Sequence, residues 1–152
     1  QESIFMSTPS DIDRDQIALG VQQPWAELIV RGLKTLEIRR MNTPKRGRIL
    51  IYASKKFSAY PIAEEMLEKH QLSKEMLTYG QLVGSVEIVN SRPAVAEDVD
   101  AACVTTELLA GHHAWELAHP QKYEVPQSVR FLPYGVWFYP FKRKQKKQRR
   151  SS

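Results

Sequence analysis

Strands and helices alternate along this sequence without the regular strand–helix–strand repeat of a parallel α/β fold. This pattern predicts an α+β domain, built on a mixed β-barrel with flanking helices on its outside. Two observations lead to the prediction: short apolar runs typical of strands recur from residue 17 to residue 139, and helical patterns lie between some of them. No internal repeat is present.

The chain divides into three segments by composition. Its 152 residues fit one domain with a core of its own. Residues 1–15 are expected to form a flexible leader, residues 16–141 the folded domain, and residues 142–152 a basic, disordered tail. Lys142–Arg150 holds seven basic residues and no acidic one, so the 22 basic residues of the chain fall to 15 without it, against 17 acidic, a net charge of −2. Nonspecific attraction to phosphate is therefore expected mostly from the tail. Two interpretations of the tail stay open: it adds nonspecific affinity for RNA, or it is a solvated segment with no specific partner.

Several classes of protein are not favoured by the sequence. No apolar run approaches the roughly 18 residues that a membrane helix needs. Residues 1–15 lack the basic and apolar regions of a signal peptide. A single cysteine, Cys103, excludes an internal disulfide framework and is expected in the core. We therefore expect a cytoplasmic protein that does not associate with membranes.

The first elements follow from apolar runs and from Pro and Gly. Ile17–Val21 predicts the first strand. Pro24 suits the first turn of a helix, because the N–H group that proline lacks would be unpaired there. Gly32 fits the end of that helix, where a left-handed residue is needed. Lys34–Arg40 then predicts a strand.

The remaining elements are predicted in the same way. Arg48–Ser54 reads as a strand buried on both faces. Three prolines break the long stretch between the last two strands. Further strands are expected at Leu82–Val89, His113–Ala118 and Gly135–Tyr139, and further helices at Ala59–His70, Ser73–Leu77 and Glu97–Ala110.

Three charged residues, Lys34, Glu37 and Arg39, lie within six positions of one another among apolar neighbours. Such side chains are rarely buried unless paired, so the trio predicts the wall of a pocket or cleft. Strand alternation puts Glu37 and Arg39 on one face, and a bend after Gly32 would turn the Lys34 amine toward Glu37. The alternative is a surface ion pair between Glu37 and Arg39, contributing about 0–1 kcal/mol.

At these positions the chain resembles a known family. Gly32, Lys34, Glu37 and Arg39 match the G-x-K-x-x-E-x-R signature of ASCH (activating-signal-cointegrator homology) domains. The resemblance covers roughly residues 17 to 141 and implies a small PUA-like β-barrel, a fold associated with RNA binding. Some relatives bind RNA, one branch cleaves it, and another deacetylates N(4)-acetylcytidine. The other matching segments are Gln23–Ala26, Lys45–Ile51, Gly84–Ile88, Ala114–Leu117 and Gly135–Trp137.

The site that we expect is a cleft that binds RNA or a modified nucleotide. Arg39 would clamp a phosphate or a base edge, Glu37 would accept a hydrogen bond from a ligand amino group, and Lys34 would contact phosphate. Lys34 and Glu37 would be the catalytic pair if the protein is an enzyme. The expected ligand-binding residues are Trp25, Lys34, Glu37, Arg39, Tyr52 and Lys55.

Three other functions remain open for this chain. The deacetylase branch has a Thr where this chain has Glu37, so an amidohydrolase would need another hydroxyl, such as that of Thr35. A metal-independent ribonuclease would use Lys34 and Glu37 directly. A ribonucleoprotein interaction module would use the basic tail. No cofactor is expected, and no metal, because the adjacent His112 and His113 point to opposite faces of a strand.

Overall fold

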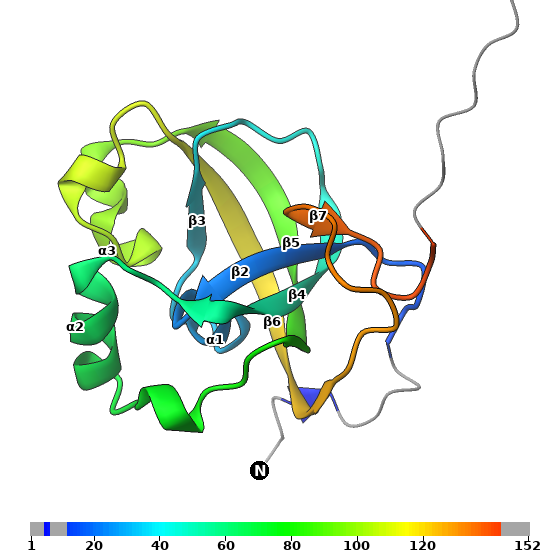
Figure 1. The fold of residues 1–152 in the computed structure, drawn as a ribbon. Helices are drawn as coiled ribbons and strands as arrows, with labels where there is room; N and C mark the ends of the chain where they lie inside the picture. Colours follow the sequence, from blue (N-terminus) through cyan, green and yellow to red (C-terminus); the bar gives the residue numbers. More distant parts are fainter. Residues whose placement is uncertain (1–4, 7–11, 144–152) are drawn as a thin grey trace, which may run out of the picture.

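Seven strands form one mixed sheet in the computed structural model, which describes residues 5–6 and 12–143 (Figure 1). The order is β1-β6-β5-β4-β2-β7, and β3 pairs with β6 beside this path. The β2–β4 and β1–β6 pairs are parallel and the other pairs antiparallel, so the expected mixed sheet is confirmed. The strands are β1 (Phe5–Met6), β2 (Ala18–Gln23), β3 (Leu36–Arg39), β4 (Gly47–Phe57), β5 (Gln81–Pro93), β6 (His113–Gln127) and β7 (Trp137–Phe138).

The sheet is open rather than closed into a barrel. Within residues 5–6 and 12–143, no backbone pairing joins β3 to β2 or to β7. A side chain links the two edges instead, because Arg39 on β3 donates from Nη2 to the carbonyl of Gly20 on β2 at 3.1 Å. The predicted barrel is therefore not confirmed by the pairing of the described strands.

Helix α1 (Trp25–Val30) forms the centre of the larger core, and all six of its residues are buried. It packs against β2, β4 and β5. Gly84 on β5 permits this packing, because a Cβ atom there would lie 2.1 Å from the Gln121 carbonyl oxygen on β6 and 2.8 Å from Val30 Cγ1. Strand β4 is buried on both faces from Ile49 to Ala53, as predicted.

The other helices are short and gather at one end of the molecule, opposite β7 (Figure 1). Helix α2 (Pro61–Lys69) and the 3-10 turn η2 (Lys74–Met76) lie where helices were expected. The predicted helix Glu97–Ala110 is wrong. That segment contains η3 (Ala96–Asp98), α3 (Val99–Ala102) and η4 (Thr106–Leu108). Cys103 ends α3 with a positive φ of 56°, and the following Val-Thr-Thr run is a poor helix former.

Strand β6 is longer than predicted, since it continues past Ala118 to Gln127. Two of the three prolines, Pro120 and Pro126, lie within β6, and Pro133 lies beyond its end. The β5–β6 register shifts between the Ser85–Gln121 and Glu87–Ala118 pairs, and His119, whose φ is +52°, and Pro120 lie in this irregularity. A proline is tolerated at a bulge because no ladder hydrogen bond is required of it there.

Parts of the leader and of the tail lie outside the described residues. Residues 5–6 pair with β6 as β1, and Ile12 packs into the smaller core with Phe138. Residues 1–4, 7–11 and 144–152 are not described, so the expected leader and disordered tail remain predictions. Among the described helices, none has the length and apolar character needed to cross a membrane. The cytoplasmic location stays a prediction too.

Candidate functional site

The turn between α1 and β3 sets the position of Lys34. Gly32 has a φ of +76°, as its predicted role at the helix end requires. The backbone N–H groups of Leu33 and Lys34 then both donate to the Leu28 carbonyl, at 2.9 and 3.0 Å. Strand β3 begins only at Leu36, so strand alternation does not fix the direction of Lys34. The bend that could bring its amine to Glu37 is present.

The Lys34 amine is buried, with 3% of the residue exposed. It donates to the carbonyl of Ala102 at the end of α3. Its Nζ lies 3.7 Å from Glu37 Oε1 and 5.4 Å from the centre of the Trp25 ring. Burial lowers the pKa of Lys34 below its usual 10.5, and the negative charge of Glu37 opposes this shift.

Glu37 lies between the two basic residues. While Oε1 faces Lys34, Oε2 accepts a hydrogen bond from Arg39 Nε at 2.6 Å. The Glu37 side chain is 8% exposed, so its negative charge is balanced mainly by these two cations. Charge-assisted hydrogen bonds of this kind hold a carboxylate in one orientation.

Arg39 is the most accessible member of the trio, with 24% of its side chain exposed. Its Nη2 donates to the Gly20 carbonyl, and its guanidinium lies 5.8 Å from the centre of the Trp115 ring. Trp115 stacks on Trp137 at 5.9 Å, and Trp115 is buried while Trp137 is half-buried. The guanidinium is thus held at the edge of a packed aromatic pair.

The trio and Trp25 line one pocket of about 320 Å³. Its walls come from β2, from the start of α1, from β3, from the turn before α2 and from the segment between α3 and β6. The full lining is Gly20, Val21, Gln22, Trp25, Lys34, Glu37, Ile38, Arg39, Tyr60, Val104, Leu108 and His112. No local sequence signal indicates the last four, because each comes from a segment far along the chain from the signature.

Two of the expected ligand-binding residues are elsewhere. Tyr52 is buried on the other face of β4, where its ring packs edge-on against Phe138 at 5.2 Å, and burial raises its pKa. Lys55 is exposed and its stem lies beside Gly80. Neither residue lines the pocket. Strand β4 continues past both of them to Phe57, so they do not lie at a strand end beside the pocket.

Several other residues weighed from the sequence also lie outside the pocket. Thr35 does not line this pocket; it lines a second cavity of about 150 Å³, which Lys34 also lines and Glu37 does not. Cys103 is buried, as expected, and burial raises the pKa of its thiol. Among the described residues, no three His, Cys, Asp or Glu side chains gather in a way that could hold a metal ion.

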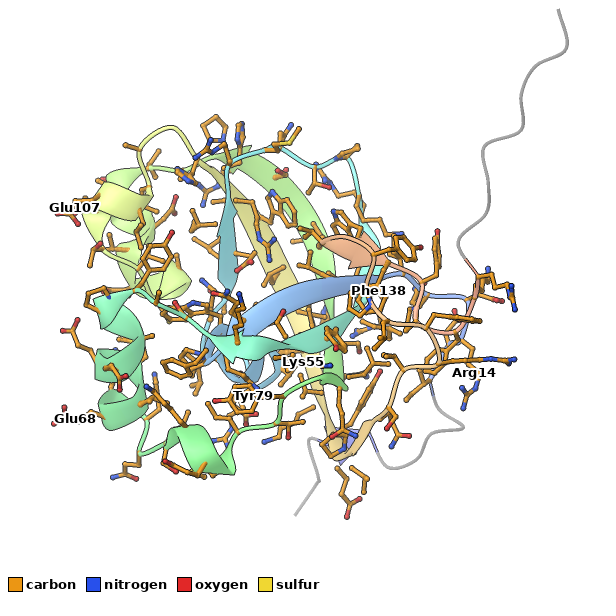
Figure 2. All side chains as sticks on the ribbon, in the orientation of Figure 1. Arg14, Lys55, Glu68, Tyr79, Glu107 and Phe138 are labelled. Carbon is orange, nitrogen blue, oxygen red and sulfur yellow. The ribbon has the colours of Figure 1, made fainter. Side chains whose placement is uncertain are left out.

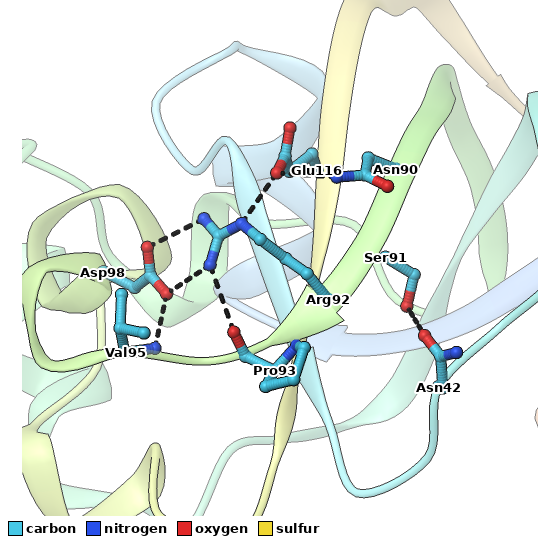
Figure 3. A network of polar contacts seen from close by, with 8 residues as sticks. All are labelled: Asn42, Asn90, Ser91, Arg92, Pro93, Val95, Asp98 and Glu116. Atoms are coloured by element: carbon cyan, nitrogen blue, oxygen red, sulfur yellow. Dashed lines mark hydrogen bonds and ion pairs between the residues drawn. The ribbon is translucent and has the colours of Figure 1, made fainter.

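A network of hydrogen bonds and ion pairs centres on Arg92 (Figure 3). Arg92 on β5 forms two hydrogen bonds with Asp98, at 2.8 and 2.9 Å, and a third with Glu116 on β6, at 2.7 Å. Asp98 also accepts from the Val95 backbone at 2.8 Å. Hydrogen bonding from Arg92 lowers the pKa of Asp98 and of Glu116. The network thereby anchors the start of α3, whose last residue, Ala102, contacts Lys34.

The family model for the ASCH domain matches residues 19–127, which include β3 to β6, all of β2 except Ala18, and every residue of the pocket. The chain belongs to the ASCH domain family. The resemblance seen in the Gly32–Arg39 signature is therefore confirmed at the level of the family.

Individual relatives agree with this assignment. Human activating signal cointegrator 1 is 42% identical over 77 residues, which are 50% of this chain and 12% of that protein. The mouse protein is 40% identical over the same length. The chain thus spans only about an eighth of the length of these ASCH-domain relatives.

Solved ASCH structures show the same fold. An ASCH protein from Zymomonas mobilis superimposes with a TM-score of 0.55 at 18% identity, over 84% of this chain and 88% of that one. A variant of the same bacterial protein gives a TM-score of 0.53 at 16% identity, over 82% and 89%. At these identities the similarity is evidence for the fold.

Proposed function

We propose that this ASCH domain binds RNA or a modified nucleotide in the pocket lined by Trp25, Lys34, Glu37 and Arg39. The observation that carries the proposal is that a Lys–Glu–Arg set, largely withdrawn from solvent, lies at one wall of a concave site. Small-molecule sites are concave and mostly apolar, with a few polar groups that fix the orientation of the ligand. The association of the family with RNA supports the same ligand class.

Each member of the trio keeps hydrogen-bonding capacity for a ligand. A lysine amine has three donor hydrogens, so the contacts of Lys34 with Ala102 and Glu37 leave one for a phosphate or carbonyl oxygen. Arg39 donates from Nε to Glu37 and from Nη2 to Gly20, and a ligand would accept from the N–H groups of Nη1. Glu37 accepts from an amino group on the ligand, since each carboxylate oxygen has two lone pairs.

The size of the pocket favours a single nucleotide base. About 320 Å³ lies at the lower end of the roughly 300–1,000 Å³ range of small-molecule pockets. Sequence-dependent recognition of RNA uses unstacked bases from single-stranded regions, which pack on aromatic rings and pair along their edges. Trp25 and Tyr60 supply aromatic walls for such a base.

Amide-resonance mapping by NMR tests this proposal. The labelled protein is titrated with cytidine, with N(4)-acetylcytidine and with a mixed-sequence single-stranded RNA. The expected result is a saturable shift of the Trp25 indole N–H and of the Gly20 and Arg39 backbone signals. The Trp137 indole serves as an internal control, because it does not line this pocket. Shifts confined to other regions would contradict the proposal.

A hydrolase is the second candidate, and the lowered pKa of Lys34 favours it. A general base needs a pKa near the working pH, and burial moves a lysine in that direction. Lys34 would take a proton from a water molecule, whose oxygen would then attack the acetyl carbonyl of N(4)-acetylcytidine. The protonated Lys34 would return that proton to N4 as the C–N4 bond breaks, so that acetate and cytidine leave. In a metal-independent ribonuclease, one member of the Lys34–Glu37 pair would instead take the proton of the attacking ribose hydroxyl. The other member would give a proton to the leaving oxygen.

Product analysis by mass spectrometry separates binding from hydrolysis. Wild-type protein and Lys34→Ala are incubated with N(4)-acetylcytidine and with the mixed-sequence RNA. In an enzyme, Lys34→Ala removes turnover with a smaller effect on affinity, because a base acts mainly in the transition state. Turnover that survives Lys34→Ala would contradict this role, and no product from the wild type would leave binding as the function.

A further inference from the structure

A second groove lies at the end of the molecule that carries β7. It has a volume of about 340 Å³ and is lined by Arg14, Asp15, Ser128, Val129, Arg130, Phe141 and Lys142. Three of these side chains are cationic and one is anionic. Arg14, Arg130 and Lys142 are all exposed, so solvent reaches the positive charges of this basic groove.

Backbone hydrogen bonds hold the two walls of the basic groove together. The N–H groups of Arg130 and Phe131 both donate to the Pro140 carbonyl, at 2.9 and 3.0 Å. On the other side, Lys142 pairs with Asp15 at 3.2 Å. The groove is therefore a structured part of the domain, formed where the segment before β2 meets the segment after β7.

Aromatic rings lie among these cations. The Arg14 guanidinium is 4.6 Å from the centre of the Phe141 ring, and the Lys142 amine is 5.4 Å from that of Tyr139. Tyr139 is 37% exposed and Tyr134, which its backbone N–H contacts, is 43% exposed. Alternating cations and exposed rings are the two components of surfaces that bind single strands, because cations follow the phosphates and rings stack on bases.

Charge is distributed unevenly between the two ends of the domain. Figure 2 shows Arg14 at one end and Glu68 and Glu107 at the other. Helix α2, at the second end, carries three glutamates and one lysine. The seven basic residues of Lys142–Arg150 begin in the basic groove itself, since Lys142 is one of its lining residues. A polyanion is thus attracted to one end of the domain.

We propose that the basic groove, with Tyr134 and Tyr139, binds the backbone and bases of a single-stranded nucleic acid. This surface is separate from the nucleotide pocket and adds a structured contact to the attraction of the tail. Asp15 in the groove and Gly20 in the pocket are five residues apart, so their Cα atoms are at most about 18 Å apart. One strand can occupy both sites.

Fluorescence anisotropy with a labelled short oligouridine RNA tests the proposal on the full chain. The test variant is Arg14→Glu with Arg130→Glu, and the matched control is Lys69→Glu with Lys74→Glu at the opposite end. The test variant is expected to bind at least about tenfold more weakly, and its salt slope to shrink by about 1.4, which is about 0.7 for each of two lost phosphate contacts. The control reverses the same number of charges and is expected to lose much less.

Neutral replacements guard against misfolding. Arg14→Gln with Arg130→Gln removes charge without adding acid, and is expected to give an intermediate loss at an unchanged melting temperature. Equal losses in the test and control variants would overturn the proposal, because net charge alone would then explain them. The proposal would also be overturned by a test variant that keeps the wild-type affinity for RNA but no longer binds a protein or an anionic vesicle that the wild type binds.

Two further comparisons identify the strand and separate this surface from the pocket. The same sequence as DNA is measured in parallel, and a preference for RNA in the wild type that the test variant loses would assign the RNA 2′-hydroxyl contacts to this groove. The test variant is expected to bind N(4)-acetylcytidine and cytidine as the wild type does. If cytidine, N(4)-acetylcytidine and the mixed-sequence RNA all leave the pocket signals of the wild type unshifted, the pocket function fails, while a weaker RNA affinity in the test variant still supports the basic groove.

Discussion

The Lys34 amine is in a position where a positive charge is costly, and three neighbours reduce that cost. Glu37 supplies an opposite charge at 3.7 Å, the Ala102 carbonyl accepts a hydrogen bond, and the face of Trp25 lies 5.4 Å away. Burial nevertheless lowers the lysine pKa. Ionisable groups with displaced pKa values concentrate at functional sites, because acids, bases and nucleophiles need pKa values matched to their task. Lys34 is therefore the residue with the strongest claim to a role in ligand binding.

The stability of the protein is expected to rise with pH on account of Lys34. Its folded pKa lies below the unfolded 10.5, so between these two values the unfolded state binds more protons and the free energy of unfolding increases with pH. The cost of the buried charge is fully present below the folded pKa. Chemical denaturation across alkaline pH measures the effect, as the difference between wild type and Lys34→Met. A difference that does not change with pH would contradict the lowered pKa.

The Arg92–Asp98 pair is expected to stabilise the segment that leads to α3. Asp98→Asn leaves the shape nearly unchanged but removes the negative charge, and is expected to cost about 1–3 kcal/mol at neutral pH. The pKa of Asp98 is lowered from 3.8, so this contribution is present above 3.8 and is lost as pH falls through the folded pKa. Thermal melts of both proteins from neutral to acid pH measure this. A gap that persists at the lowest pH would contradict the linkage.

Among the elements, those fixed by local signals were predictable and those fixed by distant partners were not. Gly32 ends α1 and turns the chain, and the two-residue period put Glu37 and Arg39 on one face of β3. The apolar spacing of Glu97–Ala110 fits a helix and therefore predicts a single one. The pairing of Asp98 with Arg92, and the left-handed Cys103, divide it into short turns.

The pocket shows the same division. Trp25, Lys34, Glu37 and Arg39 lie within fifteen consecutive positions, so one signature could bring them together. Tyr60, Leu108 and His112 reach the pocket only through the folding of distant segments, and no sequence spacing indicates that. Tyr52 lies away from the pocket, because strand alternation puts its side chain on the face of β4 that packs against Phe138.

Close packing of β5, β6 and α1 is expected to depend on Gly84. In Gly84→Ala the new methyl group would meet the Gln121 carbonyl oxygen at 2.1 Å and Val30 Cγ1 at 2.8 Å, so backbone must move. Overpacking of this kind typically costs about 1–3 kcal/mol. Gly135→Ala is the control, since the nearest atom to its Cβ is 3.7 Å away. Urea unfolding of the two variants compares them, and equal stabilities would show that the strands adjust freely.

At the scale of the whole molecule, Arg39 has a structural role beside its proposed one. Its hydrogen bond to the Gly20 carbonyl connects β3 to β2, where no backbone pairing between these strands is described. The pocket therefore lies at the open edge of the sheet, bridged by a ligand-binding candidate. Loss of the Arg39 side chain is expected to affect both binding and local structure, so every Arg39 variant needs a check of its fold.

Removal of residues 144–152 is expected to leave the domain folded and to weaken its attraction to nucleic acid. The segment holds five basic residues and no apolar ones. The melting temperature should stay the same, while the salt slope for a single-stranded RNA should shrink by about 0.7 for each lost phosphate contact. Lys142 and the basic groove remain in this variant. An unchanged salt dependence would show that the segment does not touch RNA.

The affinity of Arg39→Ala for its ligand tests whether Lys34, Glu37 and Arg39 bind a nucleotide. Arg40→Ala is the matched control, because Arg40 is the next residue along the chain and does not line the pocket. Isothermal titration with the short ligand that shifts the Trp25 indole gives each affinity, after thermal melts have verified the fold. We predict a loss of about 1.5–3 kcal/mol for Arg39→Ala, as for a charge-assisted hydrogen bond, and little change for Arg40→Ala. Equal affinities for wild type and a folded Arg39→Ala would contradict the account.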